Sequence, residues 1–271
     1  MGSTNLFQYI NSTFHYTIYG DGAEVLIAFH GFSESGRSFA SLKLALSARY
    51  TIYAFDLPFH GATKWNEPRP FTTGDLEKII IQFTQQHNVG KFAVLGFSMG
   101  GKCALHLAQT MPQKISALWL LASDGIKTNK IYNVAVYPRW GRSLFKTTIQ
   151  HPAWLFAVVN IANKLRLLSP WLKKFTYNHM ETKEKRERLY HTWISMAAFN
   201  PDINLVKKQI NQHQIPVLLF FGKRDEVIPI AVGEFFAEGL TSCLLTRLER
   251  GHYFIDEKIN PSLTAALQWL K

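Results

Sequence analysis

A single serine stands between two glycines in the segment Gly96–Gly100, which reads Gly-Phe-Ser-Met-Gly. The apolar run Phe92–Leu95 comes directly before it and predicts a buried strand. Glycines two residues before and after a serine are typical of a tight turn from a strand into a helix, because larger side chains there would collide with the backbone. Such a turn strains its central residue and presents the hydroxyl group. The string alone is weak evidence, but it makes Ser98 the candidate nucleophile.

Four more segments that could carry chemistry each follow a strand-like run. They are His30-Gly31-Phe32 after Val25–Phe29, Asp56–Gly61 after Thr51–Phe55, Gly222–Asp225 after Val217–Phe221, and Gly251-His252 after Cys243–Leu248. Ligands bind at the carboxyl ends of the strands in open α/β sheets. We therefore expect these segments and Ser98 to meet at one edge of a sheet.

The chemistry of a serine nucleophile predicts the roles of two further residues. Ser98 needs a base, because its hydroxyl is a poor nucleophile at neutral pH, and the base needs an acid that fixes its tautomer. We predict that His252 is the base and Asp225 the acid. Asp124, which follows the strand-like run Ala117–Ala122, is the rival acid. The remaining polar residues of these segments are expected to support loops: His30, His60 and Asp56.

The elements that must position these residues alternate between short strands and amphipathic helices. Five apolar runs predict strands buried on both faces of a parallel sheet: Val25–Phe29, Thr51–Phe55, Phe92–Leu95, Ala117–Ala122 and Val217–Phe221. The segment His15–Tyr19, followed by Gly20-Asp21-Gly22, predicts a hairpin that leads into Val25. Apolar spacing and proline positions predict helices over Thr73–His87, Gly101–Met111 and Pro261–Leu270. The predicted fold class is α/β, with helices on both faces of a mostly parallel sheet.

The alternation stops in the middle of the chain. From about Lys127 to Gln212 aromatic and basic residues mix without strand-like runs, and one clear helix is predicted over Thr182–Phe199. We expect residues 1–126 and 213–271 to form the core and residues 127–212 to form a helical insertion. Between Gly125 and His213 there are 15 Lys and Arg against 4 Asp and Glu, so this segment carries the whole net charge of +11.

Taken in order, the five segments resemble those of the α/β-hydrolase family with an inserted helical cap. The resemblance covers nearly the whole chain outside the insertion. It implies the chain order nucleophile, acid, histidine, which Ser98, Asp225 and His252 follow. It also implies an oxyanion hole formed by the backbone N–H groups of Phe32 and Met99.

The segment after the second parallel strand departs from the family pattern. The family usually has glycine at the position of Phe59 and serine at that of Ala62 or Thr63. A bulky Phe59 could narrow or reshape the mouth of a substrate pocket, which makes it a candidate substrate contact.

The resemblance implies a serine hydrolase that cleaves a carboxylic ester through an acyl-serine intermediate, with no metal and no cofactor. Two other reactions fit the same segments. One is that of a carbon–oxygen lyase similar to the menaquinone-pathway synthase, which typically has Arg where this chain has Lys102. The other is that of a carbon–carbon bond hydrolase, and a cofactor-free haloperoxidase is a weaker fit. A non-catalytic ligand-binding protein on the same scaffold is the alternative from a different class.

The basic insertion has three possible explanations. It could be a solvated face, it could recruit an anionic or acyl-bearing small substrate, or its basic and Trp-bearing helices could contact an acidic membrane. The predicted helix over Thr182–Phe199 opens with Lys183, Lys185, Arg186 and Arg188. Nucleic acid is not an expected partner, because no recognised binding module accompanies the charge.

Composition indicates a reducing, cytoplasmic setting. The chain has two cysteines, Cys103 and Cys243, and both fall in apolar patterns that predict small buried side chains rather than a disulfide. A secretion signal is not visible in the first residues, and no run approaches the roughly 20 apolar residues that span a bilayer.

Overall fold

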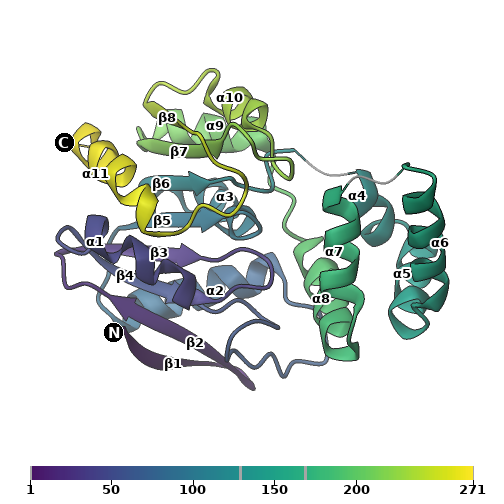
Figure 1. Cartoon of the computed structure of the whole chain (residues 1–271). Coiled ribbons are helices and arrows are strands. Elements are labelled where there is room, and N and C mark those ends of the chain that lie inside the picture. The colour runs from purple at the N-terminus through teal and green to yellow at the C-terminus, as the bar shows by residue number, and fades with distance from the viewer. Residues whose placement is uncertain (1, 128–129, 168–169, 271) are drawn as a thin grey trace. The chain divides into compact units, whose positions relative to one another are not determined.

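The computed structural model describes residues 2–127, 130–167 and 170–270 (Figure 1). Eight strands form one sheet in the order β1-β2-β4-β3-β5-β6-β7-β8. They are β1 (Ser3–Tyr9), β2 (Ser12–Tyr19), β3 (Glu24–Phe29), β4 (Tyr50–Phe55), β5 (Phe92–Phe97), β6 (Ile115–Leu121), β7 (Val217–Gly222) and β8 (Cys243–Leu248). The six strands from β3 to β8 are parallel, and β2 is antiparallel to both of its neighbours.

The first hairpin differs from the predicted one. β2 does not pair with the strand that begins near Val25; it pairs with β1 on one side and with β4 on the other. The chain reverses before β2 instead, at Ile10, which adopts a φ of 53°. β3 lies between β4 and β5 because its apolar residues on both faces need burial, whereas β2 alternates buried and partly exposed side chains.

Helices cover both faces of the sheet (Figure 1). Every residue of β5 and β7 is buried, as their uninterrupted apolar sequences require. Side chains of alternate residues point to opposite faces, so Phe220 packs in the cluster with α1 (Lys43–Leu46) and α11 (Asn260–Trp269). Phe221 lies on the other face, where its ring contacts the Gly233 position of α10 (Ile230–Ala237). The helices α2 (Thr73–Gln86) and α3 (Gly100–Thr110) follow β4 and β5 in the chain, and α3 packs against β5.

The chain divides into two compact units, and the division differs from the predicted one at its second boundary. The larger unit comprises Met1–Lys127 and Phe199–Lys271, and the smaller one Thr128–Ala198. Residues 199–212, predicted in the insertion, belong to the larger unit. The helix α9 (Ile203–Gln212) packs on α3 and buries Val206 and Ile210. An amphipathic sequence shows that one side of a helix needs to be covered, but not which unit covers it.

The smaller unit is entirely helical over its described residues. Its helices are α4 (Lys130–Val136), α5 (Arg139–Gln150), α6 (Ala153–Lys164), α7 (Pro170–Met180) and α8 (Lys183–Met196). The ring of Trp193 in α8 contacts an aromatic ring from each of α4, α5 and α7, with centroids 5.2 to 6.1 Å apart: Tyr132, Phe145 and Phe175. Several aromatic residues of this segment therefore pack together around Trp193.

Candidate active site

Ser98 occupies the turn between β5 and α3 in a left-handed conformation, with a φ of 48°. Its backbone N–H donates to the Leu121 carbonyl at 3.0 Å, and its carbonyl accepts from the N–H groups of Gly101 and Asp124 at 2.9 Å each. A side chain at Gly100 would place its Cβ 2.0 Å from the Phe29 carbonyl oxygen, so only glycine fits. The turn is therefore strained at its centre and held by its neighbours.

The side chains of Ser98, His252 and Asp225 form a chain of hydrogen bonds. The imidazole Nε2 of His252 lies 2.9 Å from the Ser98 hydroxyl oxygen, and its Nδ1 lies 2.8 Å from Oδ2 of Asp225. With Nδ1–H donating to the carboxylate, Nε2 is left to accept the hydroxyl proton. The Asp225 side chain is fully buried and that of His252 nearly so. The Phe97 ring stacks on the imidazole, with centroids 5.5 Å apart.

The loop after β7 fixes the carboxylate of Asp225. Its second oxygen, Oδ1, accepts hydrogen bonds from the backbone N–H groups of Val227 and Ile228 at 2.8 and 2.9 Å. Asp124, the rival acid, contacts residues other than His252. Asp124 accepts from the N–H of Gly125 at 2.7 Å and lies 3.8 Å from the Lys102 ammonium.

The loop after β3 lies close to Ser98. A Cβ built at Gly31 would be 3.4 Å from the Cβ of Ser98 and 3.0 Å from the Phe97 ring. Phe32 is the next residue in this loop, and Met99 directly precedes α3. The two residues predicted to form an oxyanion hole thus come from segments that approach the serine. The N-terminal end of α3 adds partial positive charge there.

His30 joins the loops after β3 and β4. Its Nδ1 lies 2.7 Å from the Gly31 carbonyl, and its Nε2 accepts from the N–H of Leu57 at 3.0 Å. One nitrogen donates and the other accepts, so the ring is neutral. Burial lowers the pKa of His30 to about 4. These contacts give His30 the loop-supporting role predicted for it.

Asp56 organises the loop that follows β4. Its carboxylate accepts from the backbone N–H groups of Gly36 at 2.7 Å and Ala62 at 2.8 Å, and its backbone carbonyl accepts from the Thr63 hydroxyl at 2.7 Å. Phe59, in the same loop, adopts a φ of 68°, a conformation that favours glycine. The family's usual glycine at this position is therefore explained by backbone conformation, and this chain tolerates a phenylalanine there.

Glu34 is a carboxyl group near the site that no sequence motif singled out. Burial raises its pKa, opposed by hydrogen bonds from Ser38 and Gly31 and by the charge of His252. Its Oε2 is buried without a hydrogen-bond partner among the described residues. A lone glutamate in a loop has no spacing that signals such a location, so only the fold reveals it.

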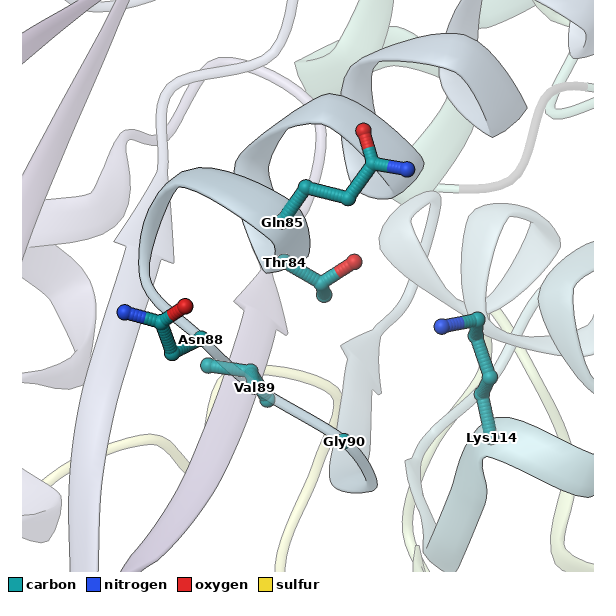
Figure 2. Close-up of a pocket in the computed structure, with 6 residues that line it drawn as sticks. All are labelled: Thr84, Gln85, Asn88, Val89, Gly90 and Lys114. Atoms are coloured by element: carbon teal, nitrogen blue, oxygen red, sulfur yellow. The ribbon is translucent and has the colours of Figure 1, made fainter.

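A surface depression of about 360 Å³ lies at the opposite edge of the sheet (Figure 2). It is lined by Thr84, Gln85, Asn88, Val89, Gly90 and Lys114. Gly90 and Lys114 precede β5 and β6, so the depression adjoins the amino ends of these strands, away from Ser98. Within residues 2–127, 130–167 and 170–270, no group of three or more His, Cys, Asp and Glu side chains could hold a metal ion.

The family model described as alpha/beta hydrolase fold matches residues 24–259. The chain belongs to the α/β-hydrolase family. The "Magnesium-chelatase 30 kDa subunit" of Rhodobacter capsulatus is 38% identical in an alignment of 261 positions that covers 91% of this chain and 87% of that protein. The "Pimeloyl-[acyl-carrier protein] methyl ester esterase" of Nitrosomonas europaea is 23% identical over 84% of this chain and 88% of its own.

Solved structures show the same α/β-hydrolase fold. A thermophilic esterase from Thermogutta terrifontis superposes with a TM-score of 0.70 at 16% identity, covering 100% of this α/β hydrolase and 98% of the esterase. At this level of identity the likeness concerns the fold, so reaction and substrate must be argued from the site itself.

Proposed function

We propose that this α/β hydrolase is a serine hydrolase that cleaves a carboxylic ester through an acyl-serine intermediate. The observation that carries the proposal is the hydrogen-bonded chain Asp225–His252–Ser98, with contacts of 2.8 and 2.9 Å. Deprotonation of Ser98 by His252 produces a nucleophile at neutral pH, and Asp225 stabilises the imidazolium that results.

The reaction proceeds in two halves. The Ser98 oxygen attacks the ester carbonyl while His252 takes its proton, and the negative charge that develops on the carbonyl oxygen is stabilised by the N–H groups of Met99 and Phe32. His252 then gives the proton to the leaving alcohol, which leaves an acyl group on Ser98. Water activated by His252 attacks this acyl-serine, releases the carboxylic acid and restores the serine. No step requires a cofactor.

We assign substrate selection to the smaller unit, as a cap. It carries 12 Lys and Arg against 3 Glu, a net charge of +9, which favours an anionic or acyl-bearing substrate. A carbon–oxygen lyase or a carbon–carbon bond hydrolase would use the same three side chains. We place the enzyme in the cytoplasm, where Cys103 and Cys243 stay free thiols as they are in the structure.

A second candidate is a non-catalytic role as a subunit of a magnesium chelatase. The 38% identity to the protein named "Magnesium-chelatase 30 kDa subunit", over 91% of this chain, favours it. Such a role would need the scaffold but not a reactive serine. Reactivity of Ser98 therefore separates the two candidates.

The test is hydrolysis of p-nitrophenyl esters of increasing acyl-chain length, together with labelling of Ser98 by a fluorophosphonate. We expect turnover and labelling of the wild type, and a fall in kcat on the order of 10⁶-fold in Ser98→Ala, because the nucleophile is lost. Absence of both turnover and labelling in the folded wild type would exclude the serine hydrolase and favour the second candidate.

Two aspartates provide a matched pair of variants. Asp225→Asn removes the carboxylate beside His252, so we expect kcat to fall by about 10⁴-fold. Asp124→Asn changes the residue that contacts Lys102, and we expect kcat within about threefold of the wild type. A large fall in kcat for Asp124→Asn, with little change for Asp225→Asn, would show that the acid is Asp124.

A further inference from the structure

The helix α6 (Ala153–Lys164) is apolar around most of its circumference, yet Val159 alone among its residues is buried. An apolar helix of a globular protein normally buries its apolar side against a core. α6 packs on α7 through one side: the Phe156 and Tyr177 rings lie 5.4 Å apart, and the Tyr177 hydroxyl donates to Asn160 Oδ1 at 2.7 Å. Most of its other apolar side chains are exposed to solvent.

The exposed apolar residues form one stripe along the helix. Trp154, Val158, Ile161 and Leu165 expose 43%, 51%, 59% and 62% of their surface. Their spacing of four, three and four residues places them on one side, because successive residues turn by about 100°. By the same rotation Phe156 and Asn160 point to the opposite side. Leu167, 77% exposed, extends the apolar surface beyond the helix end.

The stretch of sequence that contains this stripe has charge of a single sign. Residues 128–180 contain eight Lys and Arg and no Asp or Glu: Lys130, Arg139, Arg142, Lys146, Lys164, Arg166, Lys173 and Lys174. Lys164 and Arg166 flank the end of the stripe itself. None of the eight forms an ion pair with a described residue. Two cations of α8 differ, since Lys183 and Lys185 pair with Glu187 and Glu181.

We propose that α6 docks this protein on an anionic phospholipid bilayer, with the stripe of Trp154, Val158, Ile161 and Leu165 in the interface. An apolar stripe beside unpaired cations matches a surface that offers acyl chains beneath negative headgroups. A second copy of the chain is a poorer occupant, because residues 128–180 contain no carboxylate and two copies of this segment would bring like charges together. No described helix is long and apolar enough to span a bilayer, so α6 lies along the surface. Its 12 residues extend about 18 Å, against a hydrocarbon thickness of about 30 Å.

The test is flotation of the full chain with vesicles of phosphatidylcholine alone and of phosphatidylcholine mixed with phosphatidylglycerol. We expect binding to the mixed vesicles at about 0.05 M salt, weaker binding at about 0.5 M, and little binding to phosphatidylcholine, because salt screens the headgroup attraction. No binding to either vesicle, or equal binding to both, would overturn the proposal.

Matched variants locate the surface. The double variant Val158→Glu with Ile161→Glu should weaken binding to the mixed vesicles by about tenfold or more, since it places charges in the stripe. Leu44→Glu changes an 83% exposed apolar residue of the larger unit and should leave binding unchanged. Circular dichroism checks that all variants fold. Wild-type binding by the double variant would overturn the proposal. The proposal would also be overturned if the wild type formed a dimer, the double variant did not, and both bound the vesicles equally well.

Discussion

At the scale of single residues, the site depends on side chains whose protonation the fold fixes. His252 donates to a buried carboxylate and faces the hydroxyl of Ser98. His30 plays no such part: it is neutral, fully buried and bonded at both nitrogens to the backbones of two loops. Identical side chains thus receive different roles from their partners and burial.

The neutral state of His30 predicts a pH dependence of stability. Its pKa is about 4 in the fold, against the ordinary value of 6.5, so as pH falls the unfolded chain takes up the proton first. The free energy of unfolding should decrease by roughly 2–3 kcal/mol between about pH 6.5 and pH 4 through this residue. Urea unfolding of the wild type and His30→Gln across this range measures it. Parallel pH profiles of the two proteins would contradict the assignment.

At the scale of elements, the sharp turn between β5 and α3 requires close backbone approach. Gly96 and Gly100 allow it, since a Cβ at Gly96 would lie 2.6 Å from the Gly100 carbonyl oxygen and one at Gly100 would lie 2.0 Å from that of Phe29. This sharp turn also places Ser98 beside the loop after β3. The local motif therefore has a packing reason as well as a chemical one.

Gly100→Ala should consequently disturb both stability and the site. The added methyl group collides with the backbone of Phe29, which cannot move without shifting β3. We expect a loss of about 2–3 kcal/mol in unfolding free energy and slower fluorophosphonate labelling of Ser98. Gly90→Ala is the control, because its Cβ would meet nothing within 4 Å, and its stability should change by less than about 1 kcal/mol. Equal effects of the two variants would refute the packing argument.

At the scale of the whole molecule, sequence and structure divide the chain at different places. The larger unit holds the sheet, the three hydrogen-bonded side chains and α9, and the smaller unit holds α4 to α8. Charge follows this division, since the smaller unit carries +9 of the net +11. The larger unit is nearly neutral, so electrostatic attraction to an anionic partner belongs to the smaller one.

The two units should respond separately to core truncation. Ile210→Ala, in α9, should cost about 2–5 kcal/mol and speed hydrogen exchange in β5, β6 and β7. Leu189→Ala, in α8, is the matched truncation of the smaller unit and should speed exchange in α5, α7 and α8 while leaving those strands protected. Hydrogen-exchange mass spectrometry reads both. If Ile210→Ala speeds exchange only in residues 130–167 and 170–198, α9 belongs to the inserted unit and not to the larger one.

Much of the fold could be predicted from the sequence because its signals are local. The short apolar runs that form β3 to β7 are typical of strands in a sheet that is buried on both faces. The glycine spacing around Ser98 is typical of one kind of strand-to-helix turn. The α/β class and the order of the segments followed from these patterns. The pairing of β2 was predicted wrongly, because an alternating strand fits several positions near a sheet edge and its partners lie far away in the chain.

Residue types and their spacing were enough to identify the residues that could do the chemistry and to predict that they follow strands. The tertiary structure places Asp225, rather than Asp124, against His252, since the two loops direct their carboxylates to different partners. It also decided that α9 covers α3, that Glu34 lies near His252, and that the apolar residues of α6 stay exposed. The physical reason is that burial and hydrogen bonding depend on neighbours distant in sequence, which local pattern and propensity do not encode.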